Sequence, residues 1–226
     1  MHKLIVFLTF FGLFLHADSG SAFSSGEAVE VVAIGKKLLE QGKTEAAISE
    51  FEKAAMLDPR YGAAQLNLGY AFERANRVDE AMEAYRKAIE IEPRNFYAHN
   101  NLGVLYDKKG TYDRAIAEFL EALKVDSANT TALKNLETAR KNKTALLERN
   151  AVIEKAVREV VAKPNDPVPA YQLARIYANY GRKEAAIEWL DKAVGLGFKD
   201  FAYLKTDPAF TAMREEREFQ LLLLRK

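Results

Sequence analysis

"NLGYAFERANRVDEAMEAYRKAIEIEP", from Asn67 to Pro93, is followed 34 residues later by "NLGVLYDKKGTYDRAIAEFLEALKVDS", from Asn101 to Ser127. The charged residues differ between these stretches, whereas the small and apolar residues hardly change. A third copy, "GKKLLEQGKTEAAISEFEKAAMLDP", lies before both and ends at Pro59, as the copy that starts at Asn67 ends at Pro93. Recurrence in register over this period indicates tandem structural units, each of which buries its apolar face against its neighbours.

The constant positions of the first half of each copy predict one face of a helix. An apolar residue precedes a central glycine, and another large apolar residue follows it three positions later. Residues three and four apart are neighbours on a helix, so these side chains share a face. A glycine there lets a second helix approach closely. The central glycines are Gly35, Gly69 and Gly103.

The second half of each copy predicts a second helix that packs antiparallel to the first. A residue that tolerates left-handed dihedral angles ends the first helix, namely Gly42, Asn76 or Gly110. The second helix then carries a small, an aromatic and a small residue in turn. These are Ala47, Phe51 and Ala54, then Ala81, Tyr85 and Ala88, then Ala115, Phe119 and Ala122.

The pattern closely resembles the tetratricopeptide repeat family. The resemblance implies an all-α fold, in which about five antiparallel helix pairs form a right-handed superhelix that ends in C-terminal capping helices. Three regular units cover residues 28–127, a degenerate fourth covers 128–164, a fifth covers 165–198, and a capping segment covers 199–226. In the fifth unit Ala174 takes the place of the central glycine, and Gly181 marks the turn.

The fourth unit departs most from the pattern. Glu137 replaces the glycine, Arg140 replaces the aromatic residue, and no glycine marks a turn near Thr144. We expect two long helices with a weak break from Asn142 to Thr144. The alternative is one helix from about residue 129 to 162, which would divide the array into a three-repeat block and a C-terminal block.

The first 22 residues have the composition of a signal peptide. A basic start precedes an apolar run from Leu4 to Leu15, and small residues follow up to Ala22. We expect cleavage after Ala22, or else after Ala17, and a periplasmic or secreted protein. The run is short for a membrane span, so a retained anchor is the less favoured alternative. No integral membrane span is expected after cleavage.

Composition and motifs argue against several classes of function. Of 226 residues, 33 are Lys or Arg and 32 are Asp or Glu, so a net charge of +1 gives no general attraction to nucleic acid. The chain has no cysteine and no motif for a phosphate loop, catalytic triad or metalloprotease. His99, the histidine outside the signal peptide, is expected to be structural. We therefore predict no catalytic residues, no metal and no cofactor.

The resemblance also implies a binding surface, because relatives hold peptides on the concave side lined by the first helices. An asparagine stands two residues before the central position in three units, and a row of amides can pair with the backbone of an extended peptide. Alternatively, these amides serve local hydrogen bonds. The predicted peptide-binding residues are Asn67, Asn101, Asn135, Tyr70, Tyr97, Lys36, Arg74, Lys108, Lys134 and Arg175.

One specialised binding mode is not expected. Val32 and Leu66 stand where the family's clamp for a C-terminal carboxylate requires other residues. The predicted function is therefore a non-enzymatic scaffold or adaptor of the cell envelope that binds a protein or peptide partner. The alternatives are a self-associating structural protein and an accessory module that regulates a partner enzyme.

Overall fold

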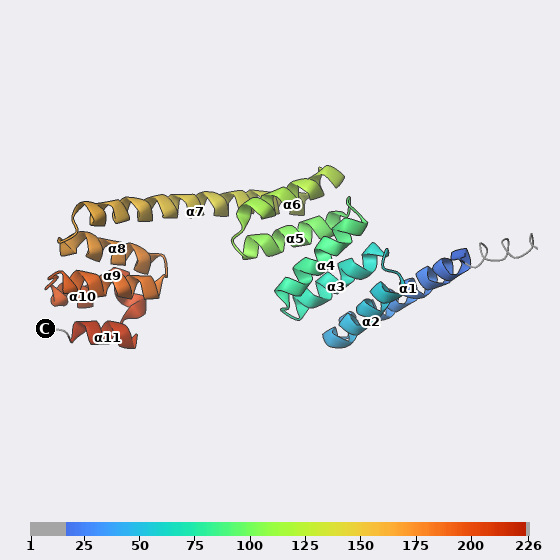
Figure 1. The fold of residues 1–226 in the computed structure, drawn as a ribbon, viewed down its shortest axis with the longest axis horizontal. Coiled ribbons are helices and arrows are strands. Elements are labelled where there is room, and N and C mark those ends of the chain that lie inside the picture. Colours follow the sequence, from blue (N-terminus) through green and yellow to red (C-terminus); the bar gives the residue numbers. More distant parts are fainter. Residues whose placement is uncertain (1–16, 225–226) are drawn as a thin grey trace, which may run out of the picture. The chain divides into compact units, whose positions relative to one another are not determined.

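The computed structural model describes residues 17–224, in which every regular element is helical (Figure 1). The chain divides into two compact units, the first ending at Lys143 and the second starting at Thr144. The predicted signal peptide lies mostly in residues 1–16, outside the described part, so its cleavage stays a prediction. In order, the elements are α1 Ala17–Glu40, α2 Thr44–Leu57, α3 Gly62–Arg74, α4 Val78–Ile91, α5 Phe96–Lys108, α6 Tyr112–Val125, α7 Thr130–Ala162, α8 Pro167–Asn179, α9 Lys183–Gly195, α10 Phe201–Thr206, the 3₁₀ helix η1 Pro208–Met213 and α11 Arg217–Leu223.

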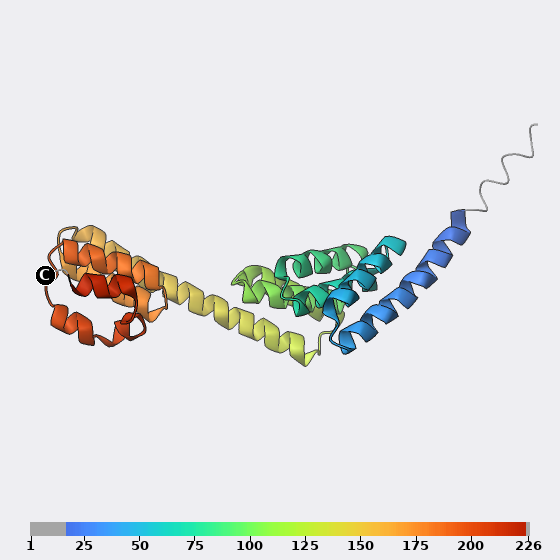
Figure 2. The same cartoon turned by 90° about the horizontal axis from the view of Figure 1, so that it is seen from below.

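The first unit contains the three predicted helix pairs, α1 with α2, α3 with α4, and α5 with α6 (Figures 1 and 2). The turn residue of each pair has a positive φ, as predicted: 75° at Gly42, 59° at Asn76 and 73° at Gly110. A residue in the left-handed region reverses the direction of the chain, so these residues end the first helix and lead into the antiparallel second helix.

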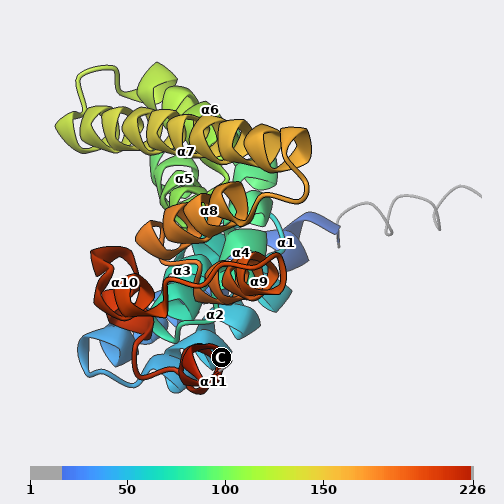
Figure 3. The ribbon, with the colours of Figure 1, turned by 90° about the vertical axis from the view of Figure 1, so that its left-hand side faces the viewer.

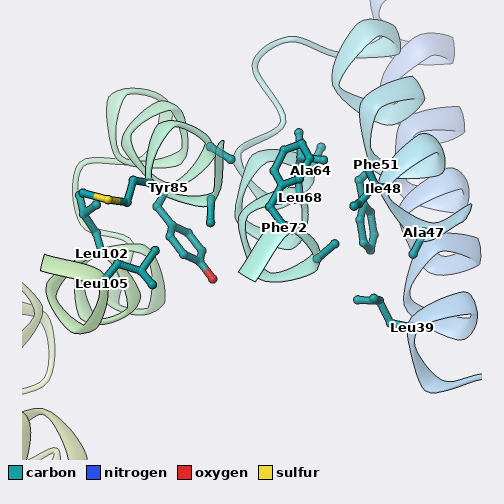
Figure 4. Packing of buried hydrophobic residues seen from close by; sticks show 14 of the residues in the cluster. Leu39, Ala47, Ile48, Phe51, Ala64, Leu68, Phe72, Tyr85, Leu102 and Leu105 are labelled. Atoms are coloured by element: carbon teal, nitrogen blue, oxygen red, sulfur yellow. The ribbon is translucent and has the colours of Figure 1, made fainter. Parts of the chain in front are cut away.

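The central glycines allow an aromatic ring of the second helix to lie against the first. A Cβ atom added to Gly69 would lie 2.6 Å from the Tyr85 ring, and one added to Gly103 would lie 2.7 Å from the Phe119 ring. The rings of Phe51, Tyr85 and Phe119 are buried, and Figure 4 shows Phe51 and Tyr85 among the core side chains. The spacing between glycine and ring is 16 residues in each pair, so one contact is built three times.

Helix α7 corrects the prediction for the fourth unit, because it continues without interruption from Thr130 to Ala162. The expected break from Asn142 to Thr144 is wrong. Glu137 and Arg140 are exposed and offer no apolar surface that a returning helix could cover. With no glycine to take up left-handed dihedrals, the local sequence contains nothing that stops the helix.

The two ends of α7 are buried in different units. In the first unit, Leu136 and Ala139 belong to the core formed by the three helix pairs. In the second unit, Ala156 and Val160 pack against Leu173 of α8. The start of α7 therefore serves as the first helix of a repeat, and its end packs beside α8 as the second helix of a repeat would.

The second unit is built on α8 and α9, joined by a turn at Gly181 with a φ of 70°. The short helices that follow gather against this pair (Figure 3). Their apolar side chains are buried with those of α8 and α9, as the predicted capping role requires, because the last pair of a stack would otherwise expose its face. These side chains are Leu204, Phe210, Met213, Phe219 and Leu222.

A buried carboxylate holds the capping segment to α8. Asp207 has no solvent exposure and accepts a hydrogen bond of 2.5 Å from the Tyr171 hydroxyl. Its Oδ2 lies 2.9 Å from Nε of Arg175, and its Oδ1 accepts from the backbone N–H of Ala209. Burial raises the pKa of Tyr171, and the bond to Asp207 raises it further. The acid is thus paired and also caps η1.

Within residues 17–224, no helix combines the length and apolar character that crossing a membrane requires.

Candidate functional site

The predicted binding residues other than Arg175 lie on the first helices of the first unit. We call this set the first-helix face. It comprises Lys36 of α1, Asn67, Tyr70 and Arg74 of α3, Tyr97, Asn101 and Lys108 of α5, and Lys134 and Asn135 of α7. The face also contains contacts between neighbouring first helices that the sequence analysis did not identify.

The three asparagines use their amides within the protein. Nδ2 of Asn67 donates to the Ala63 carbonyl at 2.6 Å, and Nδ2 of Asn101 donates to the Tyr85 hydroxyl at 3.3 Å. Nδ2 of Asn135 donates to Oδ1 of Asn100 at 3.0 Å. These bonds favour the local role that the sequence left open. Each amide keeps a second N–H, so the peptide role stays a prediction.

The Tyr85 hydroxyl connects two repeats. It accepts from Asn101 and donates to Oε2 of Glu73 at 3.3 Å, while Glu73 also accepts from Nζ of Lys108 at 3.2 Å. Burial raises the pKa of Tyr85, and the charge of Glu73 acts in the same direction. The phenol therefore stays protonated and bridges α3, α4 and α5.

Bonds between successive first helices follow a fixed spacing. Lys108 bonds Glu73, Asn135 bonds Asn100, and Nδ2 of Asn142 donates to Asp107 at 3.1 Å. In every case the partners are 35 residues apart. This spacing could have been found in the sequence. Because the repeats stack with a period of 34 residues, side chains about 34 residues apart lie next to each other on neighbouring first helices. Complementary polar pairs at that offset would have identified it.

Three exposed cations of the first-helix face have no carboxylate partner among residues 17–224, in contrast to Lys108. They are Lys36, Arg74 and Lys134. The same set of first helices carries two exposed aromatic side chains, since Tyr70 of α3 is 46% exposed and Tyr97 of α5 is 65% exposed. The face thus offers positive charge and aromatic surface together, the combination that favours an acidic segment.

The tenth predicted binding residue, Arg175, is not in the first unit. It lies on α8 of the second unit, where it pairs with Asp207 and donates to Oε1 of Gln172 at 3.0 Å. Its charge is therefore paired with the capping segment, and its role in peptide binding stays a prediction.

His99 lies between the helices of the third repeat, as the sequence predicts. It is 6% exposed, and its Nδ1 lies 2.7 Å from Oε2 of Glu118 while its Nε2 lies 3.1 Å from the Pro93 carbonyl. Both partners are acceptors, so the protonated ring satisfies both contacts. The hydrogen bond to Glu118 raises the pKa of His99 above its ordinary value of 6.5.

This raised pKa predicts a pH-dependent stability. The stabilisation is complete below pH 6.5, the ordinary value, and is lost as the pH rises through the higher folded pKa. We expect the free energy of unfolding to fall over this range, and the fall to be absent from His99→Gln. Urea unfolding of both proteins at pH values on either side of this window measures it. An equal pH slope in the variant would contradict the assignment.

The sequence predicts neither catalytic residues nor a metal site. No cluster of three or more His, Asp or Glu side chains between residues 17 and 224 is placed to hold a metal ion.

Comparisons with known proteins agree with the architecture. Three models described as tetratricopeptide repeat match residues 32–95, 84–117 and 170–196. A search of curated proteins found no match to the chain.

Solved structures show the same fold. The first tetratricopeptide repeat domain of Spaghetti (RPAP3), bound to an HSP90 peptide, is similar with a TM-score of 0.51 and 23% identity, covering 54% of this chain and 95% of that one. The second such domain of human RPAP3, in complex with an HSP70 peptide, has a TM-score of 0.50 and 20% identity, covering 52% and 98%. The domain of Arabidopsis OM64 has a TM-score of 0.50 and 21% identity, with the same coverages. The repeat matches and the stacked helix pairs together show that the chain belongs to the tetratricopeptide repeat family.

Proposed function

We propose that the chain is a non-enzymatic scaffold that binds an acidic segment of a partner protein on its first-helix face. The observation that carries the proposal is that the first helices carry both the unpaired cations Lys36, Arg74 and Lys134 and the exposed rings of Tyr70 and Tyr97. Unpaired charges of one sign attract a segment of the opposite sign, and aromatic side chains supply contact area at a small cost in entropy.

The family supports a binding role, and two similar domains were solved with peptides. Those of the RPAP3 domains, SRMEEVD and SGPTIEEVD, contain acidic residues. In this chain the apolar residues Val32, which is buried, and Leu66, which is half-buried, stand at the positions of the family's clamp for a C-terminal carboxylate. We therefore propose that the face binds acidic side chains within a segment and not the carboxylate at its end. Stacked helices hold the face in shape before binding, which lowers the entropy lost on association.

The sequence of the first 22 residues extends the proposal to location. A cleaved signal peptide would place the scaffold in the periplasm or outside the cell, where it would act as an adaptor of envelope proteins. Mass spectrometry of the N-terminus of the protein made by its native host tests this point, since cleavage after Ala22 leaves Phe23 first.

The binding proposal is tested by anisotropy titrations with three labelled peptides of equal length. One is rich in Asp and Glu with a central Leu, the second has Asn and Gln in place of the acids, and the third has Lys and Arg. We expect the acidic peptide to bind, and its affinity to fall about tenfold or more in the triple variant Lys36→Gln, Arg74→Gln and Lys134→Gln.

A matched control removes three other exposed cations of the first unit. Lys37, Lys53 and Lys87 changed to Gln subtract the same charge without altering the first-helix face. An equal loss of affinity in the two triple variants would show attraction to net charge alone and would sink the proposal. Tyr97→Ala should weaken binding without changing its salt dependence.

A further inference from the structure

The second unit contains a groove that the proposed function does not use. It lies between α9 and α11 and has a volume of about 730 Å³, within the range of sites that hold a ligand or a few side chains. The residues lining it are Lys183, Glu184, Ile187, Glu188 and Asp191 of α9, Glu216 before α11, and Glu218, Leu221 and Leu222 of α11.

Three of the lining residues are apolar. Leu222 is buried, Ile187 is half-buried, and Leu221 is 51% exposed. Ile187 follows Ala186 as Ile48 follows Ala47 in α2 and as Met82 follows Ala81 in α4. Ile48 and Met82 are each only 4% exposed in the core of the first unit, where α3 and α5 pack against their helices. In α9, the position that a following repeat would cover therefore opens onto the groove.

The charged residues of the lining are acidic apart from Lys183. Glu184, Glu188 and Glu218 are exposed, and none of them has an ion-pair partner in the described part of the chain. Lys183, the one basic residue of the lining, pairs with Glu216 and does not offset them. Carboxylates of one sign around a hollow with apolar walls concentrate a negative potential inside it.

We propose that this groove binds a cationic protein segment that inserts an aliphatic side chain. The aliphatic group would lie on Ile187, Leu221 and Leu222, and Lys or Arg residues flanking it would pair with Glu184, Glu188 and Glu218. An amphipathic helix supplies such an arrangement, with apolar anchors on one face and cations beside them. The chemistry is opposite to that of the first-helix face, so the two surfaces select different partners.

The experiment uses the chain from Phe23 to Lys226 and a labelled amphipathic peptide that carries Leu at positions i, i+3, i+4 and i+7 of a helix and Lys at the positions flanking them. Two further peptides separate the contributions: in one Leu is replaced by Gln, and in the other Lys is replaced by Glu. We expect the first peptide to bind, the second to bind about tenfold more weakly, and the third not to bind. Binding of the first should weaken as salt is raised.

Two variants localise the effect. Glu184→Gln with Glu188→Gln should lower the affinity for the Leu and Lys peptide about tenfold, whereas Glu90→Gln with Glu159→Gln, equal in charge but distant along the chain from the groove, should not. Leu221→Ser should also lower it while leaving the urea unfolding curve unchanged, because Leu221 is half exposed.

The outcomes decide between occupants. Equal loss in both double variants would show general attraction to an acidic surface and would overturn the proposal. So would a self-associated form, seen by light scattering, that the groove variant abolishes, because it would make a second copy of the chain the occupant. Loss confined to the groove variant and to Leu221→Ser supports the proposal.

Discussion

Replacement of Asp207 by alanine should lower the free energy of unfolding of the second unit by about 3 kcal/mol. The substitution leaves the buried Tyr171 hydroxyl without its acceptor, removes the charge facing Arg175, and removes the cap on Ala209 of η1. Breaking a buried pair on one side is costly, because the partner stays desolvated without compensation. Few other single changes in this unit remove three contacts together.

The chain reports this loss through its one tryptophan, Trp189, which lies on α9 in the second unit. Urea unfolding followed by Trp189 fluorescence should shift to lower urea, while hydrogen exchange of the first unit should be unaffected. Asp200→Ala is the matched control, because Asp200 caps α10 through Tyr203 but lies exposed. It should cost about 1 kcal/mol. If the two variants lose equal stability, the buried network contributes no more than a cap.

Gly103→Ala should destabilise the first unit by about 2 kcal/mol, although alanine favours helices more than glycine does. The added methyl group would lie 2.7 Å from the buried ring of Phe119, so the ring or the helix must move. Gly26→Ala is the control, because its added methyl group in α1 would meet nothing within 4 Å apart from its chain neighbours and the backbone of its own helix. Hydrogen exchange over α5 and α6, with urea unfolding followed by circular dichroism, measures both effects.

A second substitution should compensate for the strain in Gly103→Ala. In the fifth unit Ala174 occupies the glycine position, and the residue 16 positions later is Leu190 in place of a ring; both are buried in one cluster. Phe119→Leu should therefore remove the strain caused by Gly103→Ala and recover about half of its loss, giving a favourable coupling of about 2 kcal/mol in a double-mutant cycle. Additive losses would mean that the ring does not cause the strain.

The helix pairs could be predicted because their determinants are local and repeated. The left-handed turn residues, the central glycines and the buried rings all stand at fixed offsets, so the three copies support one another. Helix α7 was mispredicted because the family pattern implied a turn for which Glu137, Arg140 and Thr144 give no signal. The local sequence there was the better guide.

The site was less predictable, because exposed side chains choose partners that the repeat pattern does not specify. The sequence placed Arg175 at a binding position but could not show that the chain returns with Asp207 to neutralise it. It identified Asn135 but not its acceptor, Asn100. Such choices depend on distances between helices, which periodicity alone does not supply.

The contact between glycine and ring has a consequence for how such repeats diverge over generations. A repeat that gains alanine first must pass through a strained intermediate, whereas one that first exchanges the ring for leucine loses about 1 kcal/mol of packing and then accepts alanine freely. Selection against unstable intermediates favours the second order. The second order would leave a pair such as Ala174 with Leu190, and we expect it to pass through a repeat with Gly and Leu.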